Sequence, residues 1–331
     1  MSQAKEKILV TRAVFDDVLE ELRRHFDVDD NQRDVLLSEE ELRRRVAGKA
    51  GLLVWGNRVD AAVMDAAPSL RAVCNMMVGY NNLDIAACTE RGILATNTPG
   101  VLDDTTADQA WALLLAAARR VTESERWLRA GKWTGMPFSQ MLGTDVHHAT
   151  LGILGMGRIG RAVARRARGF DMQVIYHNRT PLDAAQEQES NARYVSFDEL
   201  LAQSDFLSLN LPYTPDSHHL IGAAELARMK SSAIIVNTAR GGIIDDAALI
   251  AALKEGHIAG AGLDVFEGEP NFNRGFLDLD NVALAPHLGS ATRATRLAMA
   301  NLAMTNLKAA LAGERPHCLI NPQAWERRRK P

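Results

Sequence analysis

The stretch Leu151-Gly152-Ile153-Leu154-Gly155-Met156-Gly157-Arg158-Ile159-Gly160 decides the fold. Its first four residues are largely apolar and predict a buried strand, while residues 159–168 have the pattern of an amphipathic helix. Between strand and helix, glycines allow a tight turn, the approach of a pyrophosphate to the backbone, and close helix–strand packing. The N-terminus of the helix adds unpaired N–H donors and a partial positive charge. The predicted dinucleotide-binding residues of this loop are Gly155, Met156, Gly157, Arg158, Ile159 and Gly160.

The end of the next predicted strand indicates which dinucleotide binds. An enzyme that uses NAD usually has an acidic residue there, about 20 residues after the first glycine, to bind the ribose hydroxyl. This chain instead has Asn178, Arg179 and Thr180, and Asn178 lies 23 residues after Gly155. Arg179 can form charge-assisted hydrogen bonds with a 2′-phosphate, and its neighbours offer neutral donors. We therefore predict that NADP(H) is preferred and that NAD(H) remains possible; the alternative is a surface arginine in a turn.

Short apolar runs alternate with helical patterns on both sides of this motif, which is typical of βαβ units and parallel sheets. The predicted strands of the first third are 8–10, 52–54, 72–76 and 93–96. A second series of six strands is predicted at 151–154, 173–176, 206–211, 233–237, 260–264 and 282–285. The sequence therefore predicts an α/β protein with two doubly wound parallel sheets.

The order of these patterns predicts the domain organisation. The turn residues of Asn97-Thr98-Pro99-Gly100 indicate a hinge, and Thr106 and Gln109 have capping-box spacing before a mostly apolar helix. A long helix predicted at 291–311 can return to the first domain. We expect a discontinuous substrate domain of residues 1–100 and 288–331, with a dinucleotide-binding domain of residues 101–287 inserted in it. The cleft between them is the expected active site.

Composition excludes several other classes of protein. The chain has 331 residues and a formal net charge of −3, with acidic and basic residues well mixed, so we expect no nucleic-acid partner. The run Ile8–Val10 is too short for the apolar part of a signal peptide, and Ala110–Ala118 is too short to span a bilayer. The three cysteines show no metal-ligand spacing. We expect a cytoplasmic protein without membrane contact.

Three polar groups follow three predicted strands, at the edge where open α/β sheets bind ligands. Arg240 follows the strand at 233–237, Glu269 lies in the loop after Asp264, and His287 follows the last strand. A nicotinamide cofactor transfers a hydride, and reduction of a carbonyl group also needs a proton at its oxygen. Histidine can donate that proton, a neighbouring carboxylate favours its charged form, and arginine can pair with a carboxylate on a ligand. We predict that these three residues are catalytic and that no metal is needed. The alternatives are a merely hydrogen-bonded loop histidine, a surface Arg-Gly-Gly turn, and Glu267 in place of Glu269.

Seven motifs in one order give the chain a resemblance to a known family over nearly its whole length. They are Val78–Asn82, Asn97–Leu102, Gly143–His148, Leu151–Gly160, Thr238–Gly241, Ala261–Pro270 and Pro286–Thr292. In these motifs the chain resembles the D-isomer-specific 2-hydroxyacid dehydrogenases, in particular their glyoxylate/hydroxypyruvate (2-ketogluconate) reductase branch. The segment Asn271–Phe276 departs from that family, which more often has a proline-rich stretch there.

The resemblance implies a Rossmann dinucleotide-binding domain inserted into a flavodoxin-like substrate domain. It implies NADPH-dependent reduction of glyoxylate, hydroxypyruvate or 2-ketogluconate to the D-2-hydroxy acid. Arg240 would bind the carboxylate and polarise the carbonyl, Glu269 would orient His287, and His287 would supply the proton. The N–H groups around Val78 and Gly79 would hold the substrate carboxylate. Further cofactor contacts are implied for Thr106, Pro212, Thr238, Asp264 and Gly289.

Two other functions fit part of this pattern. One is an NAD-linked phosphoglycerate-type dehydrogenase, and the other is a non-catalytic nicotinamide-sensing module like the C-terminal-binding corepressors. The apolar helix from Ala107, followed by Trp127 and Trp133, resembles the family's dimer surface, so we expect a homodimer. The pairs His147-His148 and His218-His219 are expected to be structural, because neighbouring side chains on an extended chain point to opposite faces.

Overall fold

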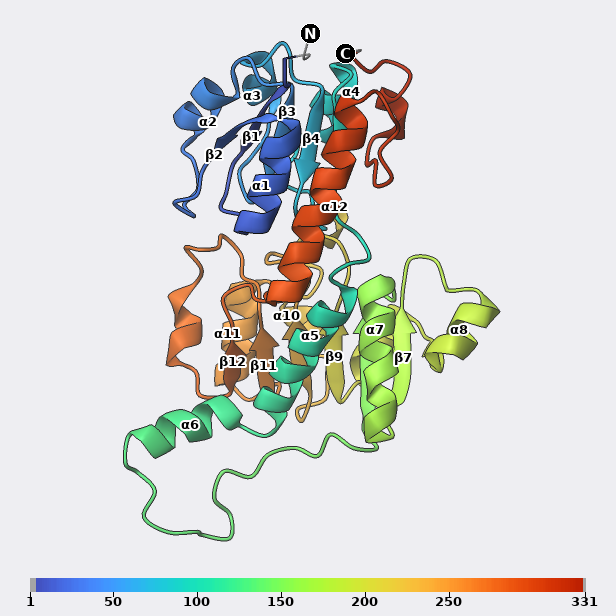
Figure 1. The fold of residues 1–331 in the computed structure, drawn as a ribbon. Helices are drawn as coiled ribbons and strands as arrows, with labels where there is room; N and C mark the ends of the chain where they lie inside the picture. The colour runs from blue at the N-terminus through green and yellow to red at the C-terminus, as the bar shows by residue number, and fades with distance from the viewer. Residues whose placement is uncertain (1–3, 330–331) are drawn as a thin grey trace. The chain divides into compact units, whose positions relative to one another are not determined.

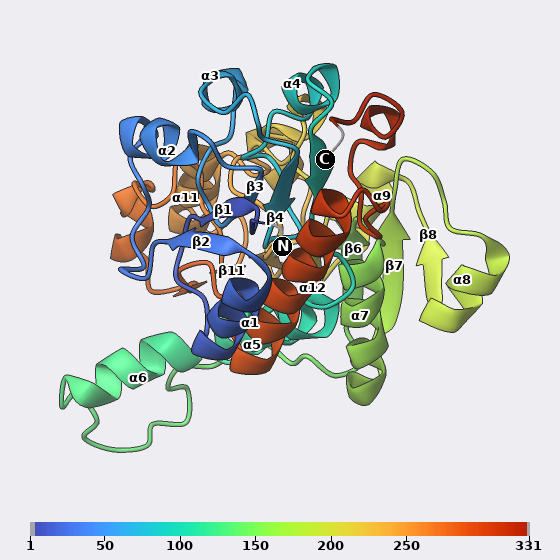
Figure 2. The same ribbon diagram turned by 45° about the horizontal axis from the view of Figure 1, so that its top comes forward.

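The computed structural model describes residues 4–329, which form two compact units. The first unit comprises the described residues up to Leu102 together with those from Thr292 onward, and the second is Asp103–Ala291. Figure 1 and Figure 2 show the helices and strands of each unit in two orientations.

The first unit contains a five-stranded parallel sheet in the order β2-β1-β3-β4-β5, which is the flavodoxin order. The helices α1 and α12 cover one face of this sheet, and α2, α3 and α4 cover the other. Figure 1 shows α12 running beside α1 and β4. The strands are β1 (Lys7–Val10), β2 (Asp27–Asp30), β3 (Gly51–Val54), β4 (Ala72–Asn75) and β5 (Leu94–Thr96). The helices are α1 (Asp16–His25), α2 (Glu39–Val46), α3 (Ala61–Asp65), α4 (Ile85–Glu90) and α12 (Arg293–Leu311), with a 3₁₀ turn η4 at Pro322–Ala324.

The second unit contains a seven-stranded parallel sheet in the order β12-β11-β10-β9-β6-β7-β8. The order reverses between β6 and β9, as in dinucleotide-binding sheets. One face packs against α5 and α7, and the other against α9, α10 and α11. The strands are β6 (Thr150–Leu154), β7 (Gln173–His177), β8 (Ala192–Tyr194), β9 (Phe206–Leu209), β10 (Ile234–Asn237), β11 (Gly260–Leu263) and β12 (Val282–Leu284). The helices are α5 (Asp103–Ala118), α6 (Val121–Arg129), α7 (Arg158–Ala167), α8 (Ala184–Ser190), α9 (Phe197–Gln203), α10 (Ala223–Leu226) and α11 (Asp246–Lys254), with 3₁₀ turns η1 (Arg168–Phe170), η2 (Pro215–Ser217) and η3 (Arg274–Asp278).

These sheets confirm the predicted fold class, with three local differences. The strands β2 and β8 were not predicted; they are the outer strands of their sheets, and β2 carries three aspartates. The helix α5 begins at Asp103, so Thr106 lies buried inside it and does not cap it. Two aspartates in the first turn, which interact favourably with the helix dipole, account for the earlier start.

The segment that departs from the family pattern is folded onto the second unit. Phe276, in η3, is fully buried, and the Phe272 ring lies 4.6 Å from the Phe266 ring. Across residues 4–329, none of the helices combines the length and the apolar character that crossing a membrane would require.

Candidate active site

The glycine loop lies at the carboxyl end of β6, where the strand order of the sheet reverses. Gly155 has φ +96°, and a Cβ placed there would lie 2.7 Å from the backbone nitrogen of Leu211. A Cβ on Gly160 would lie 2.3 Å from the carbonyl oxygen of Gly155, whereas one on Gly157 would meet nothing within 4 Å. The first and third glycines are therefore required by close backbone packing. The second borders open space at the N-terminus of α7, where a pyrophosphate fits.

The residues predicted to select the cofactor lie directly beside this loop. The Oδ1 atom of Asn178 accepts a hydrogen bond of 2.7 Å from the N–H of Met156, so Asn178 shapes the loop and keeps its NH₂ group as a donor. Arg179 and Thr180 follow and are exposed. Within residues 4–329, Arg179 forms no ion pair. Its guanidinium group is therefore available to an anionic ligand.

Three further cofactor candidates come together from three elements. A Cβ on Gly289 would lie 3.2 Å from Oδ2 of Asp264 and 3.4 Å from the methyl group of Thr106. Thr238, after β10, is 7% exposed, and its hydroxyl has no hydrogen-bond partner among the described residues. A buried hydroxyl without a partner is costly, and a polar ligand at this place would satisfy it. With the open glycine loop, this observation shows that the residues present fit a dinucleotide.

The predicted catalytic residues Arg240, Glu269 and His287 occupy the loops that follow β10, β11 and β12. The Nδ1 atom of His287 and the Oε1 atom of Glu269 are 2.7 Å apart. This contact leaves Nε2 of the ring for another partner, and both side chains are about one-third exposed, at 36% and 33%. The sequence prediction had left Glu267 open as the partner; Glu267 contacts His219 instead.

The backbone holds His287 in an unusual conformation. Its φ is +56°, in the left-handed region that a residue with a Cβ rarely adopts. Its N–H donates to the carbonyl oxygens of Asp264 (2.8 Å) and Ala285 (3.1 Å). The carboxylate of Asp264 accepts bonds of 2.7 Å each from the N–H groups of Leu288 and Gly289. Local strain maintained by surrounding contacts is typical of functional sites.

Asp264 is thus a positioning residue for this loop. Burial raises the pKa of its carboxyl group, and the two N–H donors oppose that effect. Its Oδ1 atom also lies 3.4 Å from the side-chain nitrogen of Gln109. The sequence predicted Asp264 only as a cofactor contact and Gln109 only as part of a capping box with Thr106. Their positions in the site were not predicted, because the bonds of Asp264 to Gln109 and to the loop after β12 join segments far apart in the chain.

Arg240 is half-buried, with Nη1 donating to the carbonyl oxygen of Ala239 at 2.7 Å. Burial lowers the pKa of its guanidinium group, and the nearby Glu269 carboxylate acts in the opposite direction. The glycine that follows Arg240 serves close backbone packing and does not make room for a ligand. A Cβ on Gly241 would lie 1.8 Å from the carbonyl oxygen of Phe266, so Gly241 lets the Arg240 loop approach the loop that carries Glu269.

Two further residues, Pro212 and Asn210, lie after β9 and near the glycine loop, and only Pro212 was predicted as a cofactor contact. The carbonyl oxygen of Pro212 accepts a bond from the Ser217 hydroxyl at 3.1 Å. Asn210 was not predicted, although it directly follows β9 at the point where the strand order reverses. Its Oδ1 atom is buried and has no partner among the described residues. The sequence signal that could have identified Asn210 is a polar side chain directly after a buried strand, where open α/β sheets bind ligands.

Val78 and Gly79 lie in the first unit, after β4. Their carbonyl oxygens accept bonds from the side chains of Asn97 (2.7 Å) and Asn75 (2.8 Å). Among the bonds found within residues 4–329, neither of their N–H groups is a donor. Both amides can therefore donate to a ligand.

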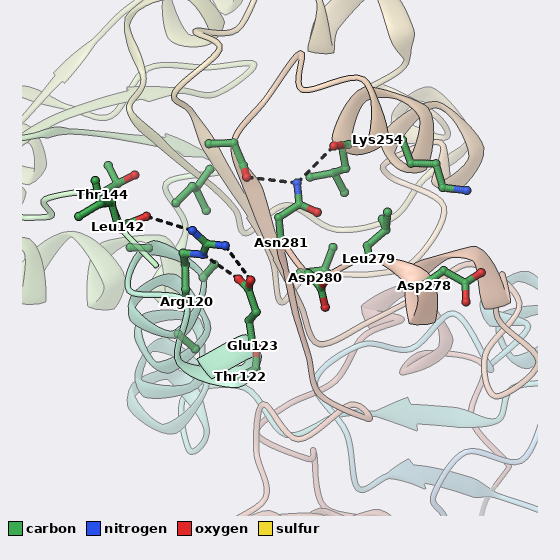
Figure 3. Close-up of a pocket in the computed structure, with 18 residues that line it drawn as sticks. Arg120, Thr122, Glu123, Leu142, Thr144, Lys254, Asp278, Leu279, Asp280 and Asn281 are labelled. Carbon is green, nitrogen blue, oxygen red and sulfur yellow. Dashed lines mark hydrogen bonds and ion pairs between the residues drawn. The ribbon is translucent and has the colours of Figure 1, made fainter. Parts of the chain in front are cut away.

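A separate cavity of about 520 Å³ lies at the opposite edge of the seven-stranded sheet (Figure 3). It is bordered by the first residue of β10 and by residues before β11 and β12, at the amino ends of these strands. In Figure 3, Arg120 pairs with Glu123, and the side chain of Asn281 donates to the backbone carbonyl oxygens of Leu253 and Ala259. This cavity is therefore distinct from the site that contains His287.

Comparisons with known proteins agree with the geometry. Residues 111–289 match the family model described as D-isomer specific 2-hydroxyacid dehydrogenase, NAD binding domain. A glyoxylate reductase of Thermococcus gammatolerans is 47% identical over 324 residues, which cover 96% of this chain and 97% of that protein. Glyoxylate/hydroxypyruvate reductase B of Pectobacterium carotovorum is 46% identical, with 96% and 99% covered.

A solved structure gives the same result. The NADPH-dependent glyoxylate/hydroxypyruvate reductase of Sinorhizobium meliloti, crystallised with NADP and malonate, superimposes with a TM-score of 0.85. It is 34% identical, and the match covers 99% of this chain and all of the other.

Proposed function

This chain belongs to the D-isomer-specific 2-hydroxyacid dehydrogenase family, and we propose that it reduces a small 2-keto acid to the D-2-hydroxy acid with NADPH. Glyoxylate, hydroxypyruvate and 2-ketogluconate are the proposed substrates. The observation that carries the proposal is the 2.7 Å contact between His287 and Glu269, with Arg240 on the neighbouring loop.

Each residue of the proposed mechanism has a role that its chemistry allows. The glycine loop at Gly155–Gly160 would hold the nicotinamide cofactor, which would supply the hydride that the carbonyl carbon accepts. Arg240 binds the carboxylate and stabilises negative charge on the carbonyl oxygen. His287 donates a proton to that oxygen as the C–O double bond becomes a single bond, and later regains a proton from water. Glu269 orients the imidazole through its contact with Nδ1. The N–H groups of Val78 and Gly79 remain the predicted second contact for the carboxylate.

The first experiment measures NADPH oxidation with the three keto acids for the wild type and His287→Ala. We expect kcat/KM to fall by at least about a hundredfold, as is typical when a positioned acid is lost. Arg240→Lys should also reduce kcat/KM and raise KM, because lysine keeps the charge but loses the bidentate geometry. His257→Ala is the matched control, since His257 is an exposed histidine of the same unit whose only ion pair within residues 4–329 is with Glu255.

Near-wild-type turnover in His287→Ala would overturn the assignment. If the wild type binds NADPH but reduces none of these acids or 3-phosphohydroxypyruvate, the nicotinamide-sensing module becomes the better description. Turnover of 3-phosphohydroxypyruvate with NADH alone would favour the phosphoglycerate-type dehydrogenase.

We further propose that Arg179 makes NADPH the preferred cofactor. Its support is the exposed, unpaired guanidinium beside Asn178 within the described chain. Arg179→Asp should lower the ratio of kcat/KM with NADPH to that with NADH by at least about tenfold, the loss of one charge-assisted hydrogen bond. Arg193→Asp, which changes another exposed arginine nearby in sequence, should leave the ratio unchanged. An unchanged ratio in Arg179→Asp would contradict this proposal.

We also propose a homodimer. Trp133, Met136 and Phe138 lie in one loop and are exposed, with Leu128 and Leu142 exposed on either side. Several large apolar side chains exposed in one segment commonly mark a protein interface. Closed symmetric dimers are the most common assembly of soluble proteins, so a second copy is the proposed partner.

A further inference from the structure

Two adjacent histidines in the second unit present their rings on the same side of the chain. The rings of His218 and His219 are stacked, with centroids 3.9 Å apart and planes 25° from parallel. The sequence argument that placed them on opposite faces is wrong, because His219 has φ +50° and is not extended. The expectation that this pair is only structural assumed an extended chain, and the backbone at His219 is not extended.

A carboxylate from a distant part of the sequence completes the cluster. Oε2 of Glu267 lies 2.9 Å from Nε2 of His219. One ligand atom from each of His218, His219 and Glu267 lies within 4.8 Å of the others. Within residues 4–329 no other group of three or more potential metal ligands meets this criterion.

Packed backbone segments hold the three ligands in place. The N–H of His219 donates to the carbonyl oxygen of Gly242 at 2.8 Å. Gly241, the residue before, packs so closely on the backbone of Phe266 and Glu267 that a side chain there would collide with it. The loop of the histidines and the loop of the carboxylate are thus joined through one short segment, which reduces the conformational cost of binding an ion.

We propose that His218, His219 and Glu267 bind one divalent transition-metal ion of the Zn²⁺ class. Two imidazoles and one carboxylate suit zinc, which accepts nitrogen and oxygen ligands about 2.0–2.2 Å away and can keep water in a fourth position. Mg²⁺ and Ca²⁺ prefer oxygen ligands and fit this set poorly. The 2.9 Å contact between His219 and Glu267 needs to open only to roughly 3.3 Å to place both atoms around a tetrahedral ion.

Groups around the cluster support the binding of a cation. The hydroxyl of Tyr213 lies 3.0 Å from Nδ1 of His218, an arrangement that orients a ligand ring from behind. Oδ2 of Asp245 lies 3.9 Å from Nδ1 of His219 and adds negative charge. His219 is about one-third exposed and Glu267 is 44% exposed, so an ion can enter from solvent.

The other histidine pair provides an internal control. His147 and His148 also lie close, with ring centroids 5.0 Å apart, because His148 has φ +61°. The nearest carboxylate, Asp145, is 3.9 Å from His147, and the pair belongs to no three-ligand group in the described chain. It matches the first pair in composition, is more exposed, and lacks the third ligand.

The test is a titration of untagged protein with Zn²⁺, measured by calorimetry. A second titration with Co²⁺ is measured by visible absorption. We expect one ion per chain and the intense spectrum of cobalt in a tetrahedral site. His218→Ala, His219→Ala and Glu267→Gln should each weaken Zn²⁺ binding by at least about tenfold, since even outer partners of a metal site contribute that much. The double variant His147→Ala/His148→Ala should bind as the wild type does, and Mg²⁺ should not compete.

Thermal unfolding without metal and NADPH binding check that each variant is folded. If one histidine variant does not fold, Glu267→Gln and His218→Gln test the same site with less change in volume. The proposal is overturned if the wild type binds no Zn²⁺, or if folded variants at His218, His219 and Glu267 bind it as tightly as the wild type. Loss of binding only in the His147/His148 variant would also overturn it. None of these outcomes depends on whether the chain reduces keto acids.

Discussion

Gly157 and Gly160 lie one helical turn apart and differ in what an added methyl group would meet. At Gly160 it would collide with the carbonyl oxygen of Gly155, whereas at Gly157 the space is open. The φ of Gly157 is −80°, which an alanine adopts without strain. The first of these glycines is therefore needed for cofactor access, and the second for packing.

Gly160→Ala should lower the free energy of unfolding by about 1–3 kcal/mol, the usual cost of overpacking. Alanine favours a helix by about 1 kcal/mol over glycine, but a rigid backbone carbonyl cannot move aside as a side chain can. Gly157→Ala should unfold as the wild type does and bind NADPH more weakly. Urea unfolding and titration of NADPH fluorescence measure the two quantities. Equal stability of the two variants would contradict this account.

At the scale of elements, the carboxylate of Asp264 joins the end of β11 to the loop after β12. It accepts two N–H bonds from that loop, and its backbone carbonyl accepts a third from His287. Correct placement of His287 therefore depends on a residue that need not touch the substrate.

Asp264→Ala should lower the free energy of unfolding by about 2 kcal/mol, because two charge-assisted hydrogen bonds are lost and the freed amides are only partly hydrated. It should reduce kcat more than it changes KM, since the proton donor moves while the arginine stays in place. Asp264→Asn, which keeps one acceptor, should lie between Ala and the wild type. Asp280→Ala removes an exposed carboxylate of the same unit and serves as the control. A wild-type kcat in Asp264→Ala would contradict this prediction, because the loop after β12 would then position His287 without the Asp264 carboxylate.

The elements also show where sequence reasoning succeeds and fails. Central strands such as β9 and β10 are buried along their whole length, so their apolar runs were easy to recognise. The edge strands β2 and β8 pair on one side only, and their polar residues gave no such run. The capping-box spacing at Thr106 predicted a later helix start, but α5 begins earlier, with two aspartates in its first turn.

The same distinction applies to the site. Residues whose position depends on a local motif, such as the glycine loop, could be assigned from the sequence alone. Contacts that join separate loops could not: Asp264 with Leu288, Asn178 with Met156, and His219 with Glu267. The sequence gives the chemical groups and their order, but these distances depend on how neighbouring loops pack.

At the scale of the whole molecule, the exposed apolar loop around Trp133, Met136 and Phe138 predicts the assembly. Light scattering after size-exclusion chromatography should give twice the chain mass for the wild type. Replacing all three residues by serine should give the monomer, because the apolar surface that drives association is lost. Val35→Ser/Leu36→Ser, which changes exposed apolar residues of the other unit, should remain dimeric. A wild-type monomer would contradict the proposal.

The discontinuous first unit sets the order in which the chain can fold as it leaves the ribosome. Ala303 and Leu307 of α12 are fully buried against strands that lie more than 200 residues earlier in the chain, so that sheet lacks the helix over one face until late in translation. The intervening roughly 190 residues take on the order of 10–40 s to synthesise. Asp103–Ala291 is continuous and can complete its own sheet first. The nascent N-terminal strands therefore remain exposed for that interval, a period in which chaperones would have access to them.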